Sequence, residues 1–237
     1  MKLNIISFII FIFTNQQAIA EINTNLEYLS TKTQYNYFAL PNNGQNNRFD
    51  IDNETETNNL RLFIEKKYVD WSFTFLIAPL KVDYTQKSKK SFLFNNTNFL
   101  KDRTTNVSYK FNSYRAGVRR FFKNNHGNKI YYGALLKIRD AELCVSQSNI
   151  TDCYDNLGPV PLLNFGFELN SSTIYTKFNI DGLFSSKGSA YDVNTEVGLS
   201  LSSFKFGIGY RMLGGGADNE KLINFAQFRS LYLSLIF

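Results

Sequence analysis

The stretch Tyr191–Leu201, YDVNTEVGLSL, decides the fold, because apolar and polar side chains alternate along its length. Val193 and Val197 fall on one set of positions, and Asp192 and Glu196 fall on the other. Successive side chains of a β-strand point to opposite faces of the sheet. The segment is therefore predicted to be a strand with one apolar face and one polar face.

The same alternation recurs in nine further segments, so ten strands are predicted, with eight or twelve as the alternatives. These segments span residues 29–37, 60–65, 71–77, 113–122, 130–139, 161–169, 174–184, 204–212 and 225–237, and the first alternates least clearly. Short connections are predicted near 66–70, 124–128, 170–172 and 202–203, and long polar ones near 41–58, 84–105, 143–158, 185–189 and 213–221. Short turns at one end and long loops at the other are typical of outer-membrane barrels.

The polar faces of these segments carry ten basic and five acidic side chains. They are Lys32, Arg61, Glu65, Lys67, Arg115, Arg119, Lys137, Arg139, Glu168, Lys177, Asp181, Asp192, Glu196, Lys205 and Arg211. Such crowding favours a lumen in which charges pair, while the aromatic apolar faces fit the girdles at two membrane interfaces. In lipid every backbone polar group must be paired, so the sheet has to close. The predicted fold is all-β, a closed antiparallel up-and-down transmembrane β-barrel; a soluble barrel with its charges outside is the alternative.

Two basic residues break this pattern, because Arg120 and Arg229 occupy positions that are expected to face lipid. An arginine at the bilayer midplane costs about 2–4 kcal/mol, and the cost falls towards zero at the interfaces. Both residues are therefore expected near an interface, unless a β-bulge shifts the parity of the strand.

Residues 1–20 read as a secretory signal peptide, with a positive charge at Lys2, a short apolar run and small residues ahead of a cleavage point after Ala20. The apolar run is about half the ~20 residues that a membrane-spanning helix needs. We therefore expect export, cleavage after Ala20, and a barrel over residues 21–237 in the cell outer membrane.

The two cysteines, Cys144 and Cys153, lie nine residues apart in a polar stretch. An oxidising compartment would let them form a disulfide, with two free thiols as the alternative. Closing so short a loop contributes about 2–3 kcal/mol in the chain-entropy account.

The final ten residues, FRSLYLSLIF, end in the aromatic Phe237 and resemble the C-terminal strand of Gram-negative outer-membrane proteins. The resemblance implies that the barrel-assembly machinery reads Phe237. The stretch from Gly209 to Phe225, with its run of three glycines, is similar to the tail of an uncharacterised outer-membrane family named for a glycine pair. That narrower resemblance brings no activity with it.

His126 is the only histidine in the chain, and it lies in the short connection NNHGN. Omptin-like proteases resemble the predicted ten-stranded architecture, but they rely on an Asp/His pair and a further Asp pair at the extracellular rim. Outer-membrane lipid A deacylases, palmitoyltransferases and phospholipases likewise need a histidine on the outer side. A general base must lie within hydrogen-bond reach of its partner, and His126 is predicted at the opposite end.

No metal-ligand cluster, phosphate loop or nucleotide fingerprint occurs, so neither a cofactor nor a metal is predicted. Lys plus Arg outnumber Asp plus Glu by 26 to 20. Because the charges alternate into a lumen and do not form a patch, nucleic acid is not a predicted partner. The predicted partners are outer-membrane lipid, lipopolysaccharide and the assembly machinery; the sequence does not give an oligomeric state.

Two functions follow from these observations. The first is a non-catalytic outer-membrane barrel with a structural or surface-binding role through its long extracellular loops. The alternative is a small anion-preferring pore lined by arginine and lysine. An outer-membrane protease or lipid-modifying enzyme comes third, because of the position of His126.

Overall fold

The computed structural model describes residues 21–42, 47–124, 126–186 and 188–237, so the predicted signal peptide lies outside the described residues. The strands are β1 (Ile22–Ala39), β2 (Phe49–Ile51), β3 (Glu56–Tyr68), β4 (Trp71–Ala78), β5 (Lys81–Lys87), β6 (Phe92–Phe94), β7 (Thr97–Phe99), β8 (Thr104–Lys123), β9 (Lys129–Gln147), β10 (Ile150–Asn170), β11 (Ile174–Ser185), β12 (Gly188–Ser200), β13 (Lys205–Asp218) and β14 (Ile223–Ile236). Within these ranges no helix has the length and apolar character needed to cross a membrane.

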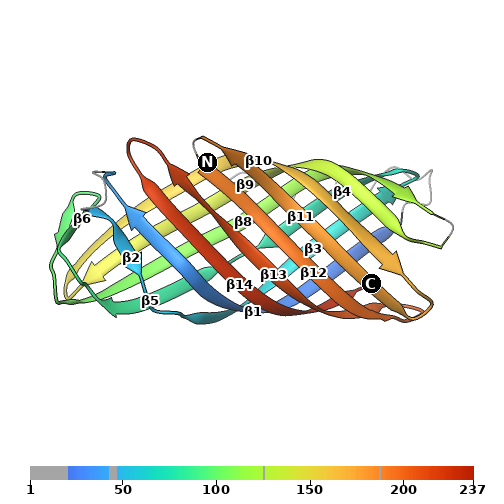
Figure 1. Ribbon diagram of the computed structural model, residues 1–237, viewed down its shortest axis with the longest axis horizontal. Coiled ribbons are helices and arrows are strands. Elements are labelled where there is room, and N and C mark those ends of the chain that lie inside the picture. Colours follow the sequence, from blue (N-terminus) through green and yellow to red (C-terminus); the bar gives the residue numbers. More distant parts are fainter. Residues whose placement is uncertain (1–20, 43–46, 125, 187) are drawn as a thin grey trace.

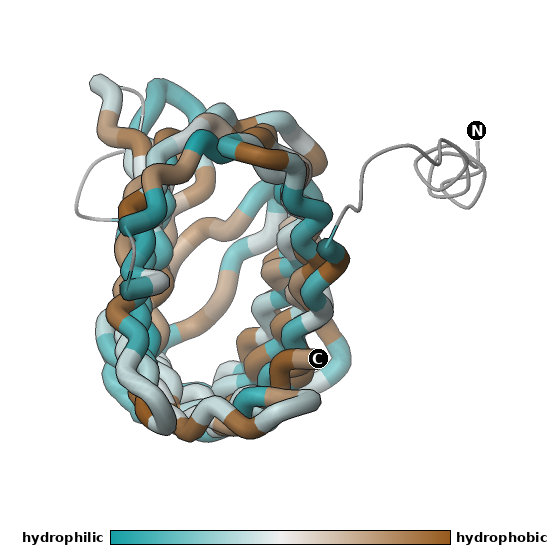
Figure 2. Tube along the Cα trace, turned by 90° about the vertical axis from the view of Figure 1, so that its right-hand side faces the viewer, coloured by the Kyte–Doolittle hydropathy of each residue, from teal (hydrophilic) through white to brown (hydrophobic). Residues whose placement is uncertain are grey.

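The sheet closes into a barrel, as predicted (Figure 1). Hydrogen-bonded neighbours follow the order β14-β13-β12-β11-β10-β9-β8-β4-β3-β1, and β14 also pairs with β1. β5 continues the wall beyond β4, because both strands pair with β8. Pro79 lies between them and has no N–H to donate to a ladder. The wall therefore has ten antiparallel strands around an oval interior, which Figure 2 shows along the barrel.

The two ends of the barrel differ. The turn end carries the short connections β3–β4, β8–β9, β10–β11 and β12–β13 together with Phe237, whose N–H donates to Thr24 O at 3.0 Å. The cap end carries β2, the β6–β7 hairpin and the tip of the β9–β10 hairpin, at the left in Figure 1.

Apolar side chains face outward and charged ones inward over most of the wall. Val197, Phe206 and Leu233 are 48, 46 and 46% exposed, whereas Glu196 and Arg211 are 2 and 3% exposed. The prediction of a lipid-facing apolar surface around a polar lumen is therefore confirmed, and the soluble alternative with charges outside is wrong.

Towards the cap end the arrangement is reversed, with apolar side chains on the inner face and charged ones on the outer face. β8 shows this change within one strand. In its turn-end half Tyr114 and Val118 point outward. In its cap-end half Val107 and Phe111 are buried inside, and Lys110 lies on the outer face. β8 pairs with β9 without a register shift. The same alternate positions therefore point inward along the whole strand, and only the type of residue at those positions changes.

The long polar connections are strands over much of their length, which corrects the predicted loops. Residues 143–147 belong to β9 and residues 150–158 to β10, and the two strands pair as far as Gln147 and Ile150. Cys144 faces Cys153 directly across that hairpin, and the predicted disulfide is present. Beyond the lipid a ladder can continue in water, and inward residues such as Val145 give it an apolar face to bury.

The prediction that Lys32 points into the lumen is wrong. Its side chain is 60% exposed and pairs with Glu56 (Nζ–Oε2 3.6 Å) on the outer face, while Thr31 and Thr33 are buried. The pairing of β1 with β14 shifts between Thr33 and Asn36, so parity reverses within the strand. The sequence did not show that Lys32 points outward, because threonine, which flanks it on both sides, is tolerated on either face of a strand.

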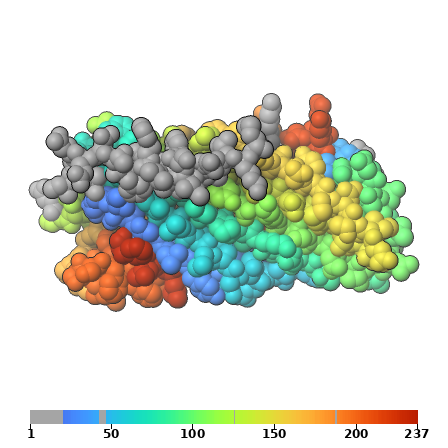
Figure 3. Space-filling view, turned by 180° about the vertical axis from the view of Figure 1, so that it is seen from behind, coloured from blue at the N-terminus to red at the C-terminus, as the bar shows by residue number. Residues whose placement is uncertain are grey.

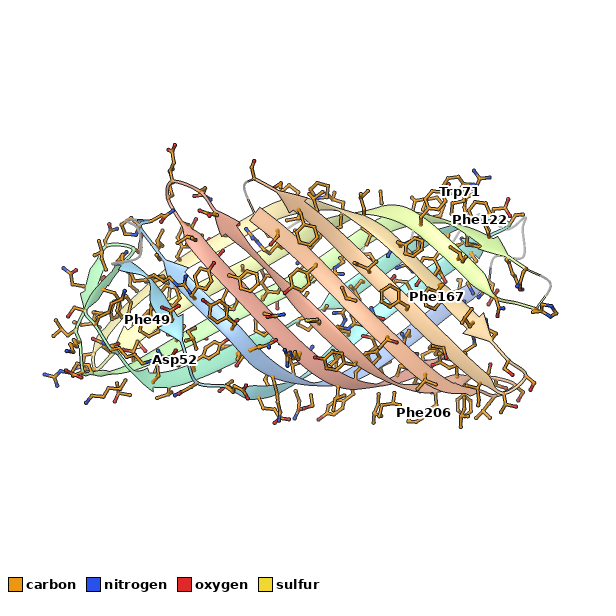
Figure 4. All side chains as sticks on the ribbon, in the orientation of Figure 1. Phe49, Asp52, Trp71, Phe122, Phe167 and Phe206 are labelled. Atoms are coloured by element: carbon orange, nitrogen blue, oxygen red, sulfur yellow. A yellow bond between two sulfur atoms is a disulfide. The ribbon has the colours of Figure 1, made fainter. Side chains whose placement is uncertain are left out.

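Both exceptional arginines lie on the outer face near the ends of the apolar belt. Arg120 stands over the rings of Trp71 and Phe122, with its Cζ 5.5 and 5.6 Å from the centroids. Trp71 and Phe122 lie at the turn end, as their labels in Figure 4 show. Arg229 lies opposite Lys32, one outward position beyond Leu231. Arg120 therefore faces outward without a bulge, and aromatic rings offset its cost.

Candidate functional site

A buried ionic network around Asp192 fills the middle of the lumen. Its carboxylate contacts Arg61 Nη2 at 3.2 Å, Arg115 Nη2 at 2.8 Å and Arg211 Nη1 at 3.3 Å. The three arginines come from β3, β8 and β13, so they meet across the lumen only because the sheet closes. All four side chains are almost fully buried.

Two further carboxylates balance these arginines. Glu27 Oε2 lies 3.3 Å from Arg61 Nε and 2.8 Å from Arg211 Nη2, and Asp181 Oδ2 lies 2.6 Å from Arg115 Nη1. Three guanidinium groups thus face three carboxylates in what we call the central ionic network (Glu27, Arg61, Arg115, Asp181, Asp192 and Arg211). Buried charges are tolerated when they are paired and hydrogen-bonded in this way.

Sequence reasoning missed Glu27, although a signal was present. Leu26 and Tyr28, on either side of it, are exposed on the outer face. Two apolar residues flanking a charged one is the same alternation that identified the other strands. The register shift between Thr33 and Asn36 concealed it, because the positions that point inward differ on its two sides.

A second group of charges lies at the turn end. Glu168 Oε1 is 2.7 Å from Lys205 Nζ, and its Oε2 is 3.8 Å from Lys129 Nζ. Lys67 Nζ contacts Glu21 Oε1 at 3.0 Å. These residues line a cavity of about 100 Å³.

The other predicted lumen charges also lie on the inner face, apart from Lys32. Arg119 Nη1 is 3.8 Å from Glu65 Oε1, and Glu196 accepts a hydrogen bond from Tyr175 at 2.5 Å. The remaining cations contact rings or amides: Lys137 Nζ is 4.4 Å from the Phe111 centroid, Lys177 Nζ is 5.7 Å from the Phe63 centroid, and Arg139 donates to Asn156 at 2.7 Å.

Tyrosines lie over inward glycines and fill the space between the charged groups. A Cβ atom on Gly209 would stand 2.2 Å from Cζ of Tyr232, and one on Gly166 would stand 2.4 Å from Cζ of Tyr131. These contacts need glycine because a ring covers the strand at that point. These tyrosine rings and the charged groups together pack the turn-end half of the lumen with side chains.

The cap end of the lumen is filled by apolar side chains, which we call the apolar plug. Its members are Phe38, Leu40, Phe49, Ile51, Leu80, Val82, Tyr84, Phe92, Phe94, Phe99, Val107, Phe111, Leu143, Val145, Leu213, Leu222, Ala226 and Phe228. They come from the wall and from the cap strands β2, β6 and β7. Phe92 and Phe99 stack across the β6–β7 hairpin, with centroids 5.3 Å apart.

Polar side chains fasten the cap to the wall. Gln147 donates from Nε2 to Leu100 O at 2.9 Å and to Thr105 Oγ1 at 2.7 Å. Asp152 accepts from Asn95 Nδ2 at 3.0 Å and from the Asn96 N–H at 3.3 Å. Partial burial opposes ionisation of Asp152, but hydrogen bonds to its carboxylate outweigh this and lower its pKa.

Two smaller cavities lie beside the central ionic network. One of about 40 Å³ touches the central ionic network, and one of about 10 Å³ lies between that network and the apolar plug. A single water needs roughly 10–15 Å³ of such space. The larger cavity has room for about three water molecules and the smaller for one at most.

His126 lies exposed in the β8–β9 turn, at the turn end, where the sequence predicted it. Its backbone N–H donates to Asn124 Oδ1 at 3.0 Å. The described residues contain no group of three or more His, Cys, Asp or Glu side chains able to hold a metal ion.

The expectation that the basic residues form no patch is wrong at the cap end. Lys87, Lys89, Lys90, Lys101 and Arg103 are all exposed where the chain leaves β5 and enters β8. The space-filling view in Figure 3 shows this green region beside the yellow β9–β10 hairpin, at the right. The sequence carried the signal, since these five cations fall within 87–103 with Asp102 as the one acidic residue there.

No protein-family description matches this chain, and no curated protein matches it in sequence. The outer membrane protease OmpT from Escherichia coli is similar in structure, with a TM-score of 0.61 and 7% identity over 94% of this chain and 99% of that chain. Neisserial surface protein A (TM-score 0.41, 13% identity, 92% and 98% covered) and the attachment invasion locus protein Ail of Yersinia pestis (0.43, 11%, 92% and 99%) are further matches. At these identities the likeness concerns fold alone. The chain has the fold of the Gram-negative outer-membrane β-barrel proteins.

Proposed function

We propose that the protein is a non-catalytic outer-membrane barrel with a closed lumen, whose cap end serves a structural or surface-binding role outside the cell. The observation that carries this proposal is that side chains fill both halves of the lumen. The central ionic network occupies one half and the apolar plug occupies the other. Small barrels are generally filled by side chains in this way.

The same filling argues against the small anion-preferring pore. Excess positive charge in a lumen favours anions only where water forms a continuous path. The apolar plug spans the cap end, and the cavities of about 40 and 10 Å³ between it and the turn-end cavity of about 100 Å³ are too small to form such a path. A hydrated ion would have to displace both layers.

The difference between the two ends of the barrel indicates how it is oriented in the membrane. Short turns face the periplasm and longer segments face outward in outer-membrane barrels. The turn end with Phe237 is therefore proposed to face the periplasm, after export and cleavage at Ala20, and the C-terminal strand to engage the assembly machinery. Lipid and lipopolysaccharide are the proposed partners of the exposed apolar belt.

A protease or lipid-modifying role would need a base at the outer rim. His126 is at the other end of the barrel, beyond hydrogen-bond reach of the cap-end carboxylates. This geometry supports the non-catalytic proposal. Protease or acyl-hydrolase activity of the refolded protein would contradict it, whether or not the activity survives His126→Ala.

Planar-bilayer recording of the refolded full-length barrel tests the closed lumen. We expect no steady single-channel steps, with heat-modifiable gel migration to show that the barrel is folded. Arg115→Glu is expected to destabilise the barrel, and Lys81→Glu on the outer face is the matched control with the same change of charge. Steady anion-selective steps whose selectivity is altered by Arg115→Glu would establish the pore instead.

A further inference from the structure

Lys177, on the inner face of β11, forms no ion pair within the described residues. It lies directly opposite Glu168 of β10 and Glu196 of β12. Both carboxylates are engaged elsewhere, because Glu168 contacts Lys205 Nζ at 2.7 Å and Glu196 accepts a hydrogen bond from Tyr175 at 2.5 Å. Burial of a charge is costly unless an anion pairs with it. The partly buried ammonium group of Lys177 therefore favours an anion beside it.

The space beside Lys177 is the cavity at the turn end, which we call the turn-end cavity. The side chains that line it carry four ammonium groups against three carboxylates: Lys67, Lys129, Lys177, Lys205, Glu21, Glu65 and Glu168. Arg119 and Glu196 lie beside these residues and carry opposite charges, so they leave the difference unchanged. The lining of the turn-end cavity thus has an excess of one positive charge.

The size of the turn-end cavity limits the class of anion. Its volume is about 100 Å³. A water molecule needs roughly 10–15 Å³ of such space, so the cavity has room for several waters or for one small ion with some of its hydration. Lys129 and Lys205 are 20 and 28% exposed, so their ammonium groups are recessed and do not form an open surface. A polymer such as nucleic acid or a charged polysaccharide does not fit, whereas a small inorganic anion does.

The turn-end cavity is accessible from one end of the barrel and blocked towards the other. Glu21 at its rim is 66% exposed, so water and ions reach the cavity from the turn end. Asn25 and Phe63 border both this cavity and the one of about 40 Å³. Beyond them lie the central ionic network and the apolar plug. An anion in the cavity therefore enters and leaves at the turn end.

We propose that the turn-end cavity binds a single chloride ion, with Lys177 as its main contact and with Lys129 and Lys205 beside it. Chloride has the single negative charge that balances the excess. Lys129 and Lys205 share the carboxylate of Glu168, and each ammonium group has three N–H donors, so donors remain for an anion. Hydrogen bonds from ammonium to an anion are charge-assisted and strong. This inference goes beyond the proposed function and needs no open path through the lumen.

Chlorine NMR of the refolded full-length barrel in zwitterionic detergent tests the proposal, because exchange of chloride with a protein site broadens its resonance. We expect saturable broadening with the wild-type protein and about tenfold weaker binding with Lys177→Gln. Lys137→Gln is the matched control. Lys137 is also a lumen cation whose Nζ lies near a ring, but it does not border the turn-end cavity, so this variant should bind like wild type.

Glu168→Gln should strengthen chloride binding, because it neutralises the carboxylate that Lys129 and Lys205 share. This gain does not depend on whether Lys177→Gln folds. The proposal is overturned by absence of saturable broadening with wild type, by equal affinities of Lys177→Gln and Lys137→Gln, or by unchanged or weaker binding in Glu168→Gln. Displacement of chloride by equimolar phosphate would overturn the assignment to a singly charged ion. Conductance recorded on the same samples tests the closed lumen separately.

Discussion

The ionic half of the lumen and the apolar half are built on the same strands, yet different forces stabilise them. β8 supplies Arg115 to the central ionic network and Phe111 to the apolar plug, and β13 supplies Arg211 and Leu213 in the same way. The first half is stabilised by paired charges and the second by burial of apolar surface.

The surroundings of the wall explain this difference. Within the apolar belt the outer face meets lipid, so apolar residues gain nothing by pointing inward and the polar residues collect in the lumen. Beyond the belt the outer face meets water, so the ordinary hydrophobic effect drives apolar side chains inside. One barrel therefore contains a membrane-type interior and a soluble-type interior in series. Four experiments separate the two.

The largest effect is expected from Asp192→Asn, because three arginines would lose their shared carboxylate. Breaking a buried ion pair by removing one partner costs about 3–5 kcal/mol. Urea unfolding in lipid vesicles, followed by fluorescence of Trp71, measures the change. Asp155→Asn is the control, since Asp155 is exposed and should leave the unfolding midpoint unchanged. Equal midpoints for the two variants would show that the network contributes no stability.

Leu143→Ala tests the apolar half. Removing this buried side chain should cost about 2–3 kcal/mol through lost burial and an unfilled cavity. The loss should not depend on salt, because no charge is involved. Leu157→Ala on the same hairpin is the control, since Leu157 is 72% exposed. A loss that disappears at high salt would contradict apolar stabilisation.

A smaller effect is expected from Gly209→Ala, which places a methyl group against the ring of Tyr232. Overpacking of this kind costs about 1–3 kcal/mol. The cost should fall when Tyr232 is first changed to alanine, which a double-mutant cycle measures. At Gly158, where the nearest atom to an added Cβ is 3.7 Å away, alanine should be tolerated. Equal costs at the two glycines would show that ring contact is not the cause.

The smallest effect concerns the fastening of the cap by Asp152. Because its pKa in the folded protein is lowered, its contribution is present at neutral pH and is lost as pH falls through that lowered pKa. Hydrogen exchange at the Asn96 amide should quicken relative to the barrel at acid pH, after correction for intrinsic rates. Asp152→Asn should abolish this pH dependence. Identical pH profiles for the two proteins would assign the fastening to other contacts.

The alternation of side chains determined much of the fold by itself. Segments such as Tyr191–Leu201 specify which residues face lipid, and the count of such segments predicted ten strands. The alternation gave the wrong face for Lys32 for two reasons. A register shift in β1 reverses which positions point inward, and the neighbouring threonines give no contrast between an apolar and a polar face. The sequence also indicated where the apolar face of β8 changes, because the apolar residues move from odd-numbered to even-numbered positions between Phe111 and Tyr114.

Tertiary structure decided which charges meet. Glu27, Arg61, Asp192 and Arg211 lie on four strands, and their contacts depend on the barrel's stagger and diameter, which no local pattern encodes. The cap likewise became a plug only through packing of β2, β6 and β7 into the mouth. Local sequence determines the face on which a side chain lies, because strand geometry repeats every two residues; its partner across the lumen depends on closure of the whole sheet.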